Sequence, residues 1–549
     1  MTGPDTRLQV MWNRLLAVVE EQGQALVRAA FSPIVRECGD ISAGIFDRQG
    51  RMLAQAVTGT PGHINTMAEA VKTLVGQFGN SAMAPGDIFL TNDPWIASGH
   101  LNDFLLMMPV FHGGAVIGYT ACTSHLVDLG GLGMGPEGAD IYDEGLLIPP
   151  CKLVSAGAVN TLLLDIVKAN SREPIANEGD IYALIACCEA GAQRLEQMMR
   201  EFGQDTLDPL ADYIIDTSYR GTMAEIASLP HGTWQSDLWV DGYDEKILLR
   251  AALRIDDTGV ALDFAGSAPC VGKGINVPLN YATAYAVFAL RCLIGPDIPN
   301  NAGSLAAFRV DAPPGSILNA QPPAPVAMRH SIGQMVPDLV YGCLSQALPD
   351  RVPAEGASCM YDLPLRHVPE ATGTPEDPHF ALELVFNGGT GARPARDGLS
   401  ATAFPSGVWG SQIETTEAAA PVLFHRREYR IDSGGPGRTR GGLGQRIEVS
   451  AADDRDFMLF LSVERVAVPA AGRFGGQPGA PGRITIGAQC DLPGKAAYRV
   501  RAGEMLVFET PGGGGFGPPQ DRDPDALADD VAQGLVSPLV AQKDYGGAA

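Results

Sequence analysis

The stretch from residue 92 to residue 131 reads NDPWIASGHLNDFLLMMPVFHGGAVIGYTACTSHLVDLGG. It contains two apolar, β-prone runs, 104–111 and 115–122, on either side of a HisGlyGly segment at 112–114. A short Gly-rich segment between two such runs is typical of a hairpin turn. Pro109 has no N–H to donate, so it has to face an edge or a bulge. The stretch therefore predicts a β-hairpin.

Two His-x-x-Asp units lie in the same window, His100 with Asp103 and His125 with Asp128. The chain has nine histidines, and His100, His112 and His125 are within this stretch. A two- or three-residue turn sets Asp103 opposite position 123 or 124, one diagonal step (roughly 7–8 Å) from His125. Imidazole beside carboxylate suits a divalent ion such as Zn²⁺ or Mn²⁺. The alternative is that these histidines are polar loop residues at strand ends.

Composition limits the classes of protein that this chain can be. Its 549 residues are too many for one core and suggest about two to four domains. The formal net charge of -24 argues against nucleic acid and anionic membrane surfaces as partners. No run approaches the roughly 18–20 apolar residues of a transmembrane helix. Ten scattered cysteines without a CxxC pair indicate free thiols, and we expect a cytoplasmic protein.

Glycine (66) and proline (41) are abundant but spread along the chain, which favours a loop-rich enzyme over a disordered tether. Helical patterns cover 64–78, 178–203 and 208–228, and short strands separated by Gly-rich turns follow from about 420. We expect a multi-domain mixed α/β (α+β) fold with a mainly-β C-terminal region. The expected parts are a metal-site α/β domain (1–230), a central α/β domain (231–415), a β-rich domain (416–520) and a C-terminal helix and tail (521–549).

A long Gly-rich segment, 131–145, follows the second His-x-x-Asp unit and offers Asp140, Tyr142 and Glu144. Its position fits a lid or substrate loop, and a plain connecting loop fits it equally. Asp40 follows a glycine at the mouth of a predicted strand, where an acidic residue is commonly a turn or cap residue.

The segment SGGPGRTRGGLG (433–444) packs Arg438 and Arg440 among glycines. It could bind an anion through backbone N–H groups and guanidinium, or be a turn whose arginines pair with acids of the same chain. There is no GxSxG elbow and no Walker A motif. A serine nucleophile is therefore unsupported, and ATP has no recognisable site in this chain.

Several motifs occur in a fixed order, and together they resemble the hydantoinase B / oxoprolinase family over nearly the whole chain. The motifs are CGDISAG (38–44), PGHINTM (61–67), GHLND (99–103), SHLVDLGG (124–131), EGLLIPP (144–150), NSREPIANEGD (170–180), DSGGPGRTRGGLG (432–444) and PGGGGFG (511–517). The family includes B subunits of ATP-dependent hydantoinases and lactamases, the C-terminal half of 5-oxoprolinases, and metal-binding subunits of acetone carboxylases.

The resemblance implies a hetero-oligomer, A2B2 or larger, with a hydantoinase A-type subunit that binds and hydrolyses ATP. It places the family's metal ligands on His100, Asp103 and His125, with Asp40 as a further ligand or essential acid. The metal would be Zn or Mn. Asp40, Asp103 and Asp128 are the expected catalytic carboxylates, and Asp128 has a proton-transfer or supporting role.

The resemblance also implies a reaction on a small-molecule substrate. The A subunit would phosphorylate an oxygen of a hydantoin, lactam or 5-oxoproline, and this chain would hydrolyse the activated intermediate. The alternative is a subunit of an ATP-dependent ketone carboxylase of the acetone or acetophenone type. The absence of long insertions favours the amide-hydrolysing branch. A third interpretation is a structural or regulatory partner that shares the fold without catalysis.

Overall fold

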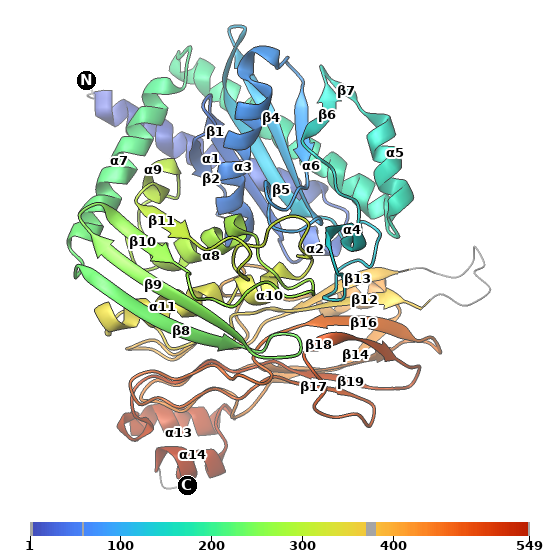
Figure 1. Ribbon diagram of the computed structural model, residues 1–549, viewed down its shortest axis with the longest axis vertical. Coiled ribbons are helices and arrows are strands. Elements are labelled where there is room, and N and C mark those ends of the chain that lie inside the picture. Colours follow the sequence, from blue (N-terminus) through green and yellow to red (C-terminus); the bar gives the residue numbers. More distant parts are fainter. Residues whose placement is uncertain (1–3, 58–59, 369–379, 547–549) are drawn as a thin grey trace.

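The computed structural model describes residues 4–57, 60–368 and 380–546. Four sheets and their helices form a multi-domain α+β protein, so the expected fold class is confirmed. The N-terminal sheet and its helices occupy one end of the molecule, and the last strands and helices occupy the other (Figure 1). In the described part of the chain, no helix is long and apolar enough to cross a membrane.

The N-terminal sheet has seven strands in the order β2-β1-β5-β4-β3-β6-β7. Helices α1 and α6 share a core with one of its faces, and helix α3 shares a second core with the other face. Phe104 and Leu106 belong to the first core, and Leu105 and Met107 to the second. Because both faces are covered, these strands read as continuous apolar runs without polar alternation.

The elements of this region have the following bounds: α1 Pro4–Ala29, α2 Pro33–Arg36, β1 Ile41–Asp47, β2 Met52–Gln55, α3 Pro61–Phe78, η1 Asn80–Ala82, β3 Ile88–Thr91, β4 Asp103–His112, β5 Ala115–His125, α4 Ile141–Glu144, β6 Cys151–Ser155, β7 Ala158–Val159, α5 Thr161–Asn170, α6 Pro174–Phe202 and α7 Asp208–Ala227.

The predicted hairpin is present as β4 and β5, joined by Gly113 and Gly114, both with positive φ. Its register differs from the expected diagonal one, because a bulge between Val110 and Phe111 shifts the pairing and sets Asp103 directly opposite His125. A shift by one residue moves a side chain to the other face of a sheet. Without the bulge, Asp103 would face position 124 and His125 would point away from it.

A second sheet, in the order β11-β10-β9-β8, packs against α8 and α11 in a separate core. The bounds here are β8 Gly232–Val240, β9 Ile247–Asp256, β10 Gly259–Asp263, α8 Leu279–Arg291, α9 Ala302–Leu305, β11 Phe308–Asp311, α10 Arg329–Gly333 and α11 Val336–Ala347.

The last two sheets, β13-β12-β16-β18 and β14-β15-β19-β17, share one core. The predicted boundary near 415 separates strands that the structure joins, since β12 pairs with β16. The four-part division itself stays a prediction. The bounds are β12 Tyr361–His367, β13 Ala381–Phe386, α12 Ile413–Ala419, β14 Val422–Tyr429, β15 Gln445–Ala451, β16 Phe457–Ser462, β17 Arg483–Ile486, β18 Lys495–Val500, β19 Leu506–Glu509, η2 Pro519–Asp521, α13 Pro524–Ala532 and α14 Pro538–Tyr545.

Candidate metal centre

Three strand ends bring Asp40, His125 and Asp103 into one row. The pairing of Ile41 with Ser124 extends β1 so that Asp40 lies beside His125, whose backbone N–H donates to the Asp40 carbonyl at 3.3 Å. Asp103 pairs with His125 on the other side. All three side chains are buried, and Asp103 is fully so. Sheet register therefore assembles residues that are far apart in the sequence.

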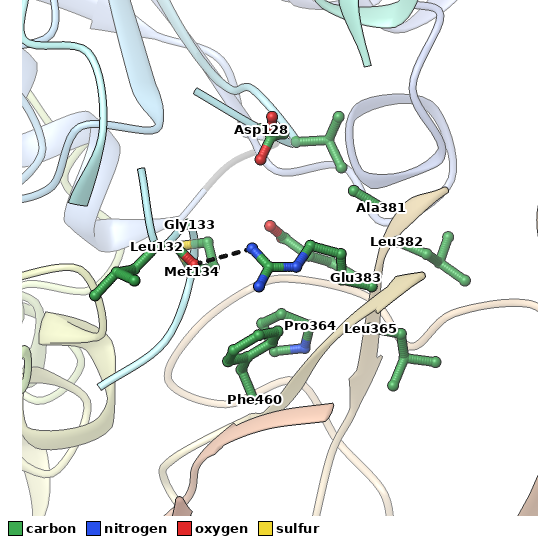
Figure 2. Close-up of a pocket in the computed structure, with 12 residues that line it drawn as sticks. Asp128, Leu132, Gly133, Met134, Pro364, Leu365, Ala381, Leu382, Glu383 and Phe460 are labelled. Carbon is green, nitrogen blue, oxygen red and sulfur yellow. Dashed lines mark hydrogen bonds between the residues drawn. The ribbon is translucent and has the colours of Figure 1, made fainter. Parts of the chain in front are cut away.

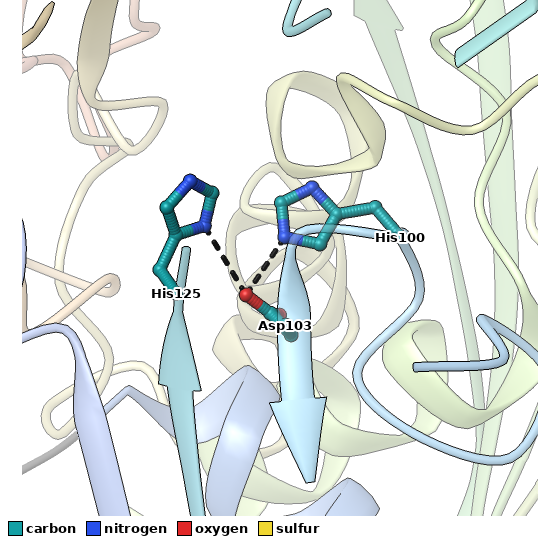
Figure 3. A group of neighbouring side chains, drawn as sticks. All are labelled: His100, Asp103 and His125. Atoms are coloured by element: carbon teal, nitrogen blue, oxygen red, sulfur yellow. Dashed lines mark hydrogen bonds and ion pairs between the residues drawn. The ribbon is translucent and has the colours of Figure 1, made fainter. Parts of the chain in front are cut away.

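The loop before β4 adds His100 to this row, so that three side chains converge on one point (Figure 3). The Nε2 atom of His100 lies 2.8 Å from Oδ1 of Asp103, and Nδ1 of His125 lies 3.2 Å from the same oxygen. One donor atom from each residue falls within 4.8 Å of the others. The short distance between Nε2 of His100 and Asp103 is not accompanied by hydrogen-bond angles, so this nitrogen has no hydrogen-bond partner among the described residues. Two imidazole nitrogens and a carboxylate oxygen aimed at a common point fit a Zn²⁺ or Mn²⁺ ion.

Each of these histidines has an acceptor on its other ring nitrogen. Nδ1 of His100 lies 3.0 Å from the Ala327 carbonyl, and Nε2 of His125 lies 3.1 Å from Oε1 of Glu383. An N–H donated outward in this way leaves Nε2 of His100 free for an ion, whereas Nδ1 of His125 contacts Asp103 and would have to lose its proton before it binds one. Both partners come from sequence more than 200 residues away. The sequence prediction contained neither of them.

The second oxygen of Asp103 is held by two further residues that the sequence prediction missed. Nε2 of His63 lies 2.9 Å from Oδ2, and the Arg329 guanidinium donates to the same oxygen at 2.7 Å. His63 lies in the first turn of α3, where Pro61 follows the N-cap Thr60. Its Nδ1 atom faces Oδ1 of Asp40 at 3.5 Å, and neither atom has a hydrogen-bond partner among the described residues. His63 thus links the two carboxylates.

Burial and charge set the protonation states of the cluster. Burial and the nearby Arg329 guanidinium lower the pKa of His100 to about 3, so this imidazole is neutral and able to bind a metal. Burial alone would raise the pKa of Asp103, but His100, His63 and Arg329 have the larger opposite effect. The pKa of Asp103 therefore lies well below its usual range. Burial alone would lower the pKa of His125, but the Glu383 and Asp103 carboxylates outweigh this effect. The pKa of His125 therefore lies well above its usual value.

Several further ionisable side chains are buried around this point. Asp40, Asp103 and Glu383 are in contact with the histidines, and Arg329 is the guanidinium that faces them. Burial and the neighbouring Glu383 raise the pKa of a further buried acid, Asp362, well above its usual value. A divalent ion bound at the cluster would take the place of the proton that the carboxylates hold on His125.

Asp128 lies apart from the cluster, in an ion pair with Arg172 at 2.5 Å. It also accepts the backbone N–H groups of Arg172 and Gly130. Together with Glu383 it lines a narrow cleft of about 20 Å³ (Figure 2), which has room for one water molecule. No hydrogen bond or ion pair among the described residues joins Asp128 to His125. Its proton-transfer role stays a prediction, and Glu383 connects the cleft to the cluster.

The three candidates in the Gly-rich segment serve different structural purposes. Asp140 caps α4 by accepting the N–H groups of Tyr142 and Asp143. Tyr142 is 72% exposed. Glu144 is buried and accepts the N–H groups of Val326 and Ala327 at 2.6 and 2.8 Å, and burial raises its pKa to about 8. Because Ala327 also contacts His100, Glu144 fixes the segment that orients this histidine. A substrate role for these residues stays a prediction.

The two arginines of the segment 433–444 are engaged with the chain itself. Arg440 is buried and paired with Asp530 of α13 at 3.2 Å, which matches the ion-pair alternative. Arg438 donates to the Pro394 carbonyl at 3.1 Å and lies 5.8 Å from the centre of the Phe516 ring. Anion binding by this pair stays a prediction, and Arg440 would have to leave an existing partner.

Known proteins share both the sequence pattern and the fold of this chain. The family model for Hydantoinase B/oxoprolinase matches residues 5–519. The chain is 27% identical over 567 residues to a putative D-/L-hydantoinase B subunit of Pseudomonas sp. (strain NS671), covering 98% of this chain and 94% of that one. The crystal structure of ATP-dependent caprolactamase from Pseudomonas jessenii matches 100% of this chain and 96% of its own, with a TM-score of 0.90 and 27% identity.

Acetone carboxylase in its nucleotide-free structure has the same fold, with a TM-score of 0.86 and 21% identity over 99% of this chain and 80% of its own. At that identity the likeness concerns the fold alone. The family model, in contrast, spans nearly the whole chain and includes every residue of the His-Asp-His cluster. The chain belongs to the hydantoinase B/oxoprolinase family.

Proposed function

We propose that this chain is the metal-dependent subunit of an ATP-dependent cyclic-amide hydrolase, and that it acts with a hydantoinase A-type ATPase subunit. The observation that carries this proposal is the buried cluster of His100, Asp103 and His125, whose donor atoms converge while their outer atoms are held by other residues. The names of the related hydantoinase B subunit and ATP-dependent caprolactamase support the substrate class and the need for a partner.

The chemistry of an unstrained amide explains why one subunit would activate the substrate and the other would hydrolyse it. Amide resonance and a poor leaving group make direct attack by water slow. Phosphorylation of the amide oxygen by the partner gives an imidate-like carbon that water can attack. His100, Asp103 and His125 would hold a divalent ion, which would supply a Lewis acid and favour deprotonation of water at neutral pH.

The chain's own residues then orient the site and handle the proton. Arg329 and His63 hold Oδ2 of Asp103, which keeps Oδ1 directed at the histidines. The Asp40 carboxylate, facing Nδ1 of His63 at 3.5 Å, is placed to accept the proton that leaves the attacking water. Glu383 orients His125 from the side of the cleft.

ATP is assigned to the partner on two grounds. The chain contains no Walker A motif, and Arg440 of its Gly-rich segment is already paired with Asp530. The proposal therefore needs a partner for turnover but not for metal binding. This separates the two halves of the function experimentally.

The test is a reconstitution of the purified chain with a co-expressed A-type subunit, ATP and Zn²⁺ or Mn²⁺. One mixture contains a hydantoin or lactam, and a matched mixture contains acetone or acetophenone with bicarbonate. We expect a ring-opened product in the first mixture alone, dependent on all components. Carboxylated ketone in place of that product would instead support the carboxylase alternative.

A matched pair of variants tests whether the cluster carries the activity. His125→Ala removes one metal-binding imidazole, whereas His112→Ala removes the histidine at the opposite end of the same hairpin. We expect hydrolysis to be lost in the first variant and kept in the second. Full activity of His125→Ala would overturn the proposal, and a metal-free, inactive wild type would favour a non-catalytic role.

A further inference from the structure

A second pocket lies between the central region and the loops of the C-terminal sheets. It has a volume of about 340 Å³, which is within the range of small-molecule sites. Its walls come from the end of α8, from α11 and from the loops that follow α11 and β13. None of its lining residues belongs to the metal cluster. The pocket is thus separate from the centre described above.

One part of the pocket wall is apolar. Leu293, Tyr341 and Phe404 line it, and Phe404 is backed by Phe288 with ring centres 5.8 Å apart. Burial raises the pKa of the Cys292 thiol, and it raises the pKa of the Tyr341 phenol further still, so both groups are neutral at physiological pH. Such walls suit a compact hydrocarbon or aromatic group.

The only acid of the lining is already compensated. Asp338 pairs with the buried Arg465 at 2.7 Å and accepts the Ser358 hydroxyl at 2.6 Å. The backbone N–H of Gly356 adds a weak third contact. Asp338 therefore contributes little free negative charge to the pocket and does not favour a cationic ligand.

Two arginines of the lining, Arg351 and Arg393, differ from Asp338 because they have no oppositely charged partner among the described residues. Arg351 donates to the Leu293 carbonyl at 2.5 Å, and Arg393 donates to the Asp397 carbonyl at 2.7 Å. Both acceptors are neutral, and no carboxylate of the described residues lies within ion-pair distance of either guanidinium. In a chain with 63 acidic and 39 basic side chains, two such arginines on one pocket leave a local positive charge without a counterion. Guanidinium groups bind carboxylates through strong, charge-assisted hydrogen bonds.

We propose that this pocket binds an organic carboxylate with a compact apolar body. The carboxylate would meet Arg351 and Arg393, and the apolar body would lie against Leu293, Tyr341 and Phe404. An inorganic anion would leave the apolar walls exposed to water, and a neutral apolar molecule would leave the arginines without a counterion. The inference is independent of the proposed hydrolase activity, because neither the metal cluster nor ATP takes part.

The test uses the full chain and two probes of the same shape, 4-phenylbutyrate and its neutral amide, in calorimetric titrations. We expect the acid to bind at least about tenfold more tightly than the amide, since a charge-assisted contact is roughly twice as strong as a neutral one. The double variant Arg351→Gln with Arg393→Gln should remove this preference. Equal binding of both probes, or no binding of the acid, would overturn the proposal.

Two further variants make the result specific. Arg396→Gln changes a neighbouring exposed arginine outside the pocket lining and should leave binding of the acid unchanged. His125→Ala should also leave it unchanged, because the metal cluster is elsewhere. Loss of binding in His125→Ala would mean that the probe had bound at the metal centre, and this would overturn the assignment. Thermal melts of each variant verify that it is folded.

Discussion

The metal cluster and the Gly-rich segment 433–444 were both candidate sites in the sequence, and they differ in how their polar groups are used. At the cluster, Nε2 of His100 and Nδ1 of His63 are buried without hydrogen-bond partners. In the segment 433–444, the Arg440 guanidinium pairs with Asp530 and donates to the Gly441 carbonyl. Ring nitrogens without a hydrogen-bond partner are available to a ligand, whereas the paired Arg440 guanidinium holds two parts of the chain together.

The glycines of the two C-terminal segments have a packing explanation. A Cβ added at Gly441 would lie 1.9 Å from the Gly513 carbonyl oxygen, and one at Gly513 would lie 2.0 Å from that of Thr390. The segments 433–444 and 510–517 thus approach each other backbone to backbone. Glycine is required there because no side chain fits, which is a different reason from the cradling of a phosphate.

The largest effect is expected at Asp103, and it would sharpen the contrast between the two regions. Asp103→Asn keeps the shape of the side chain and can still accept from Arg329, but it removes the charge directed at both histidines. We expect turnover of the reconstituted enzyme to fall by more than about 10³-fold, because the ion and its water would no longer be held. Steady-state hydrolysis of the lactam measures it.

Asn is preferable to Ala at this position. Asp103→Ala would leave the buried Arg329 guanidinium without its partner, at a cost of about 3–5 kcal/mol in stability. Loss of activity in Asp103→Ala could then reflect unfolding. A folded Asp103→Asn variant with wild-type activity would refute the metal-centre account.

The glycine argument predicts a loss of stability without loss of a ligand site. Gly441→Ala puts a methyl group against the backbone of Gly513, and we expect the free energy of unfolding to drop by several kcal/mol, of the order of other overpacked sites. Chemical denaturation measures it. Gly76→Ala, in helix α3 with no atom within 4 Å, is the matched control and should be neutral or stabilising. A Gly441→Ala protein as stable as wild type would contradict the packing explanation.

Glu383 provides a test of how the distant β13 strand supports the cluster. Its carboxylate accepts from Nε2 of His125, so Glu383→Ala should weaken metal binding by about 10–100-fold. Glu383→Gln keeps an oxygen acceptor at the same place and should retain most of the affinity. Competition with a coloured chelator measures both. Equal affinities of the Ala variant and the wild type would show that His125 needs no such partner.

The smallest effect concerns pH and Glu144. Its folded pKa of about 8 exceeds the unfolded value near 4.5, so the folded protein retains a proton that the unfolded chain releases. Stability should therefore fall as pH rises from 4.5 to 8. Glu144→Gln can still accept from Val326 and Ala327, and it should be more stable than wild type by about 1–2 kcal/mol at pH 8 and equal to it near pH 4. Parallel denaturation curves at both pH values decide this.

Local patterns were sufficient for much of the fold. The hairpin predicted in 92–131 is present as β4 and β5, and α6 and α7 lie within a few residues of the predicted helices 178–203 and 208–228. Helix α3 begins at Pro61 and not at 64, because Thr60 is its N-cap. The late predicted start excluded His63 from the helix and from the site. Pro at the first position of a helix was the signal that could have found it.

Other parts of the site depend on long-range pairing that a single sequence does not encode locally. Glu383 and Arg329 reach the cluster from β13 and α10, and no spacing rule connects them to His125 or Asp103. The bulge between Val110 and Phe111 decides the face of His125, and one residue more or less in the hairpin would have reversed it. In contrast, His100 and Asp103 are three residues apart, and their pairing was visible in the sequence.

The central claim is that His100, Asp103 and His125 hold one divalent ion. Equilibrium dialysis of the purified chain against Zn²⁺ or Mn²⁺, followed by elemental analysis, tests it without a partner or a substrate. We predict one tightly bound ion per chain in wild type and in His112→Ala, and none in His100→Ala or His125→Ala. An ion retained with unchanged affinity by folded His100→Ala and His125→Ala would contradict the account.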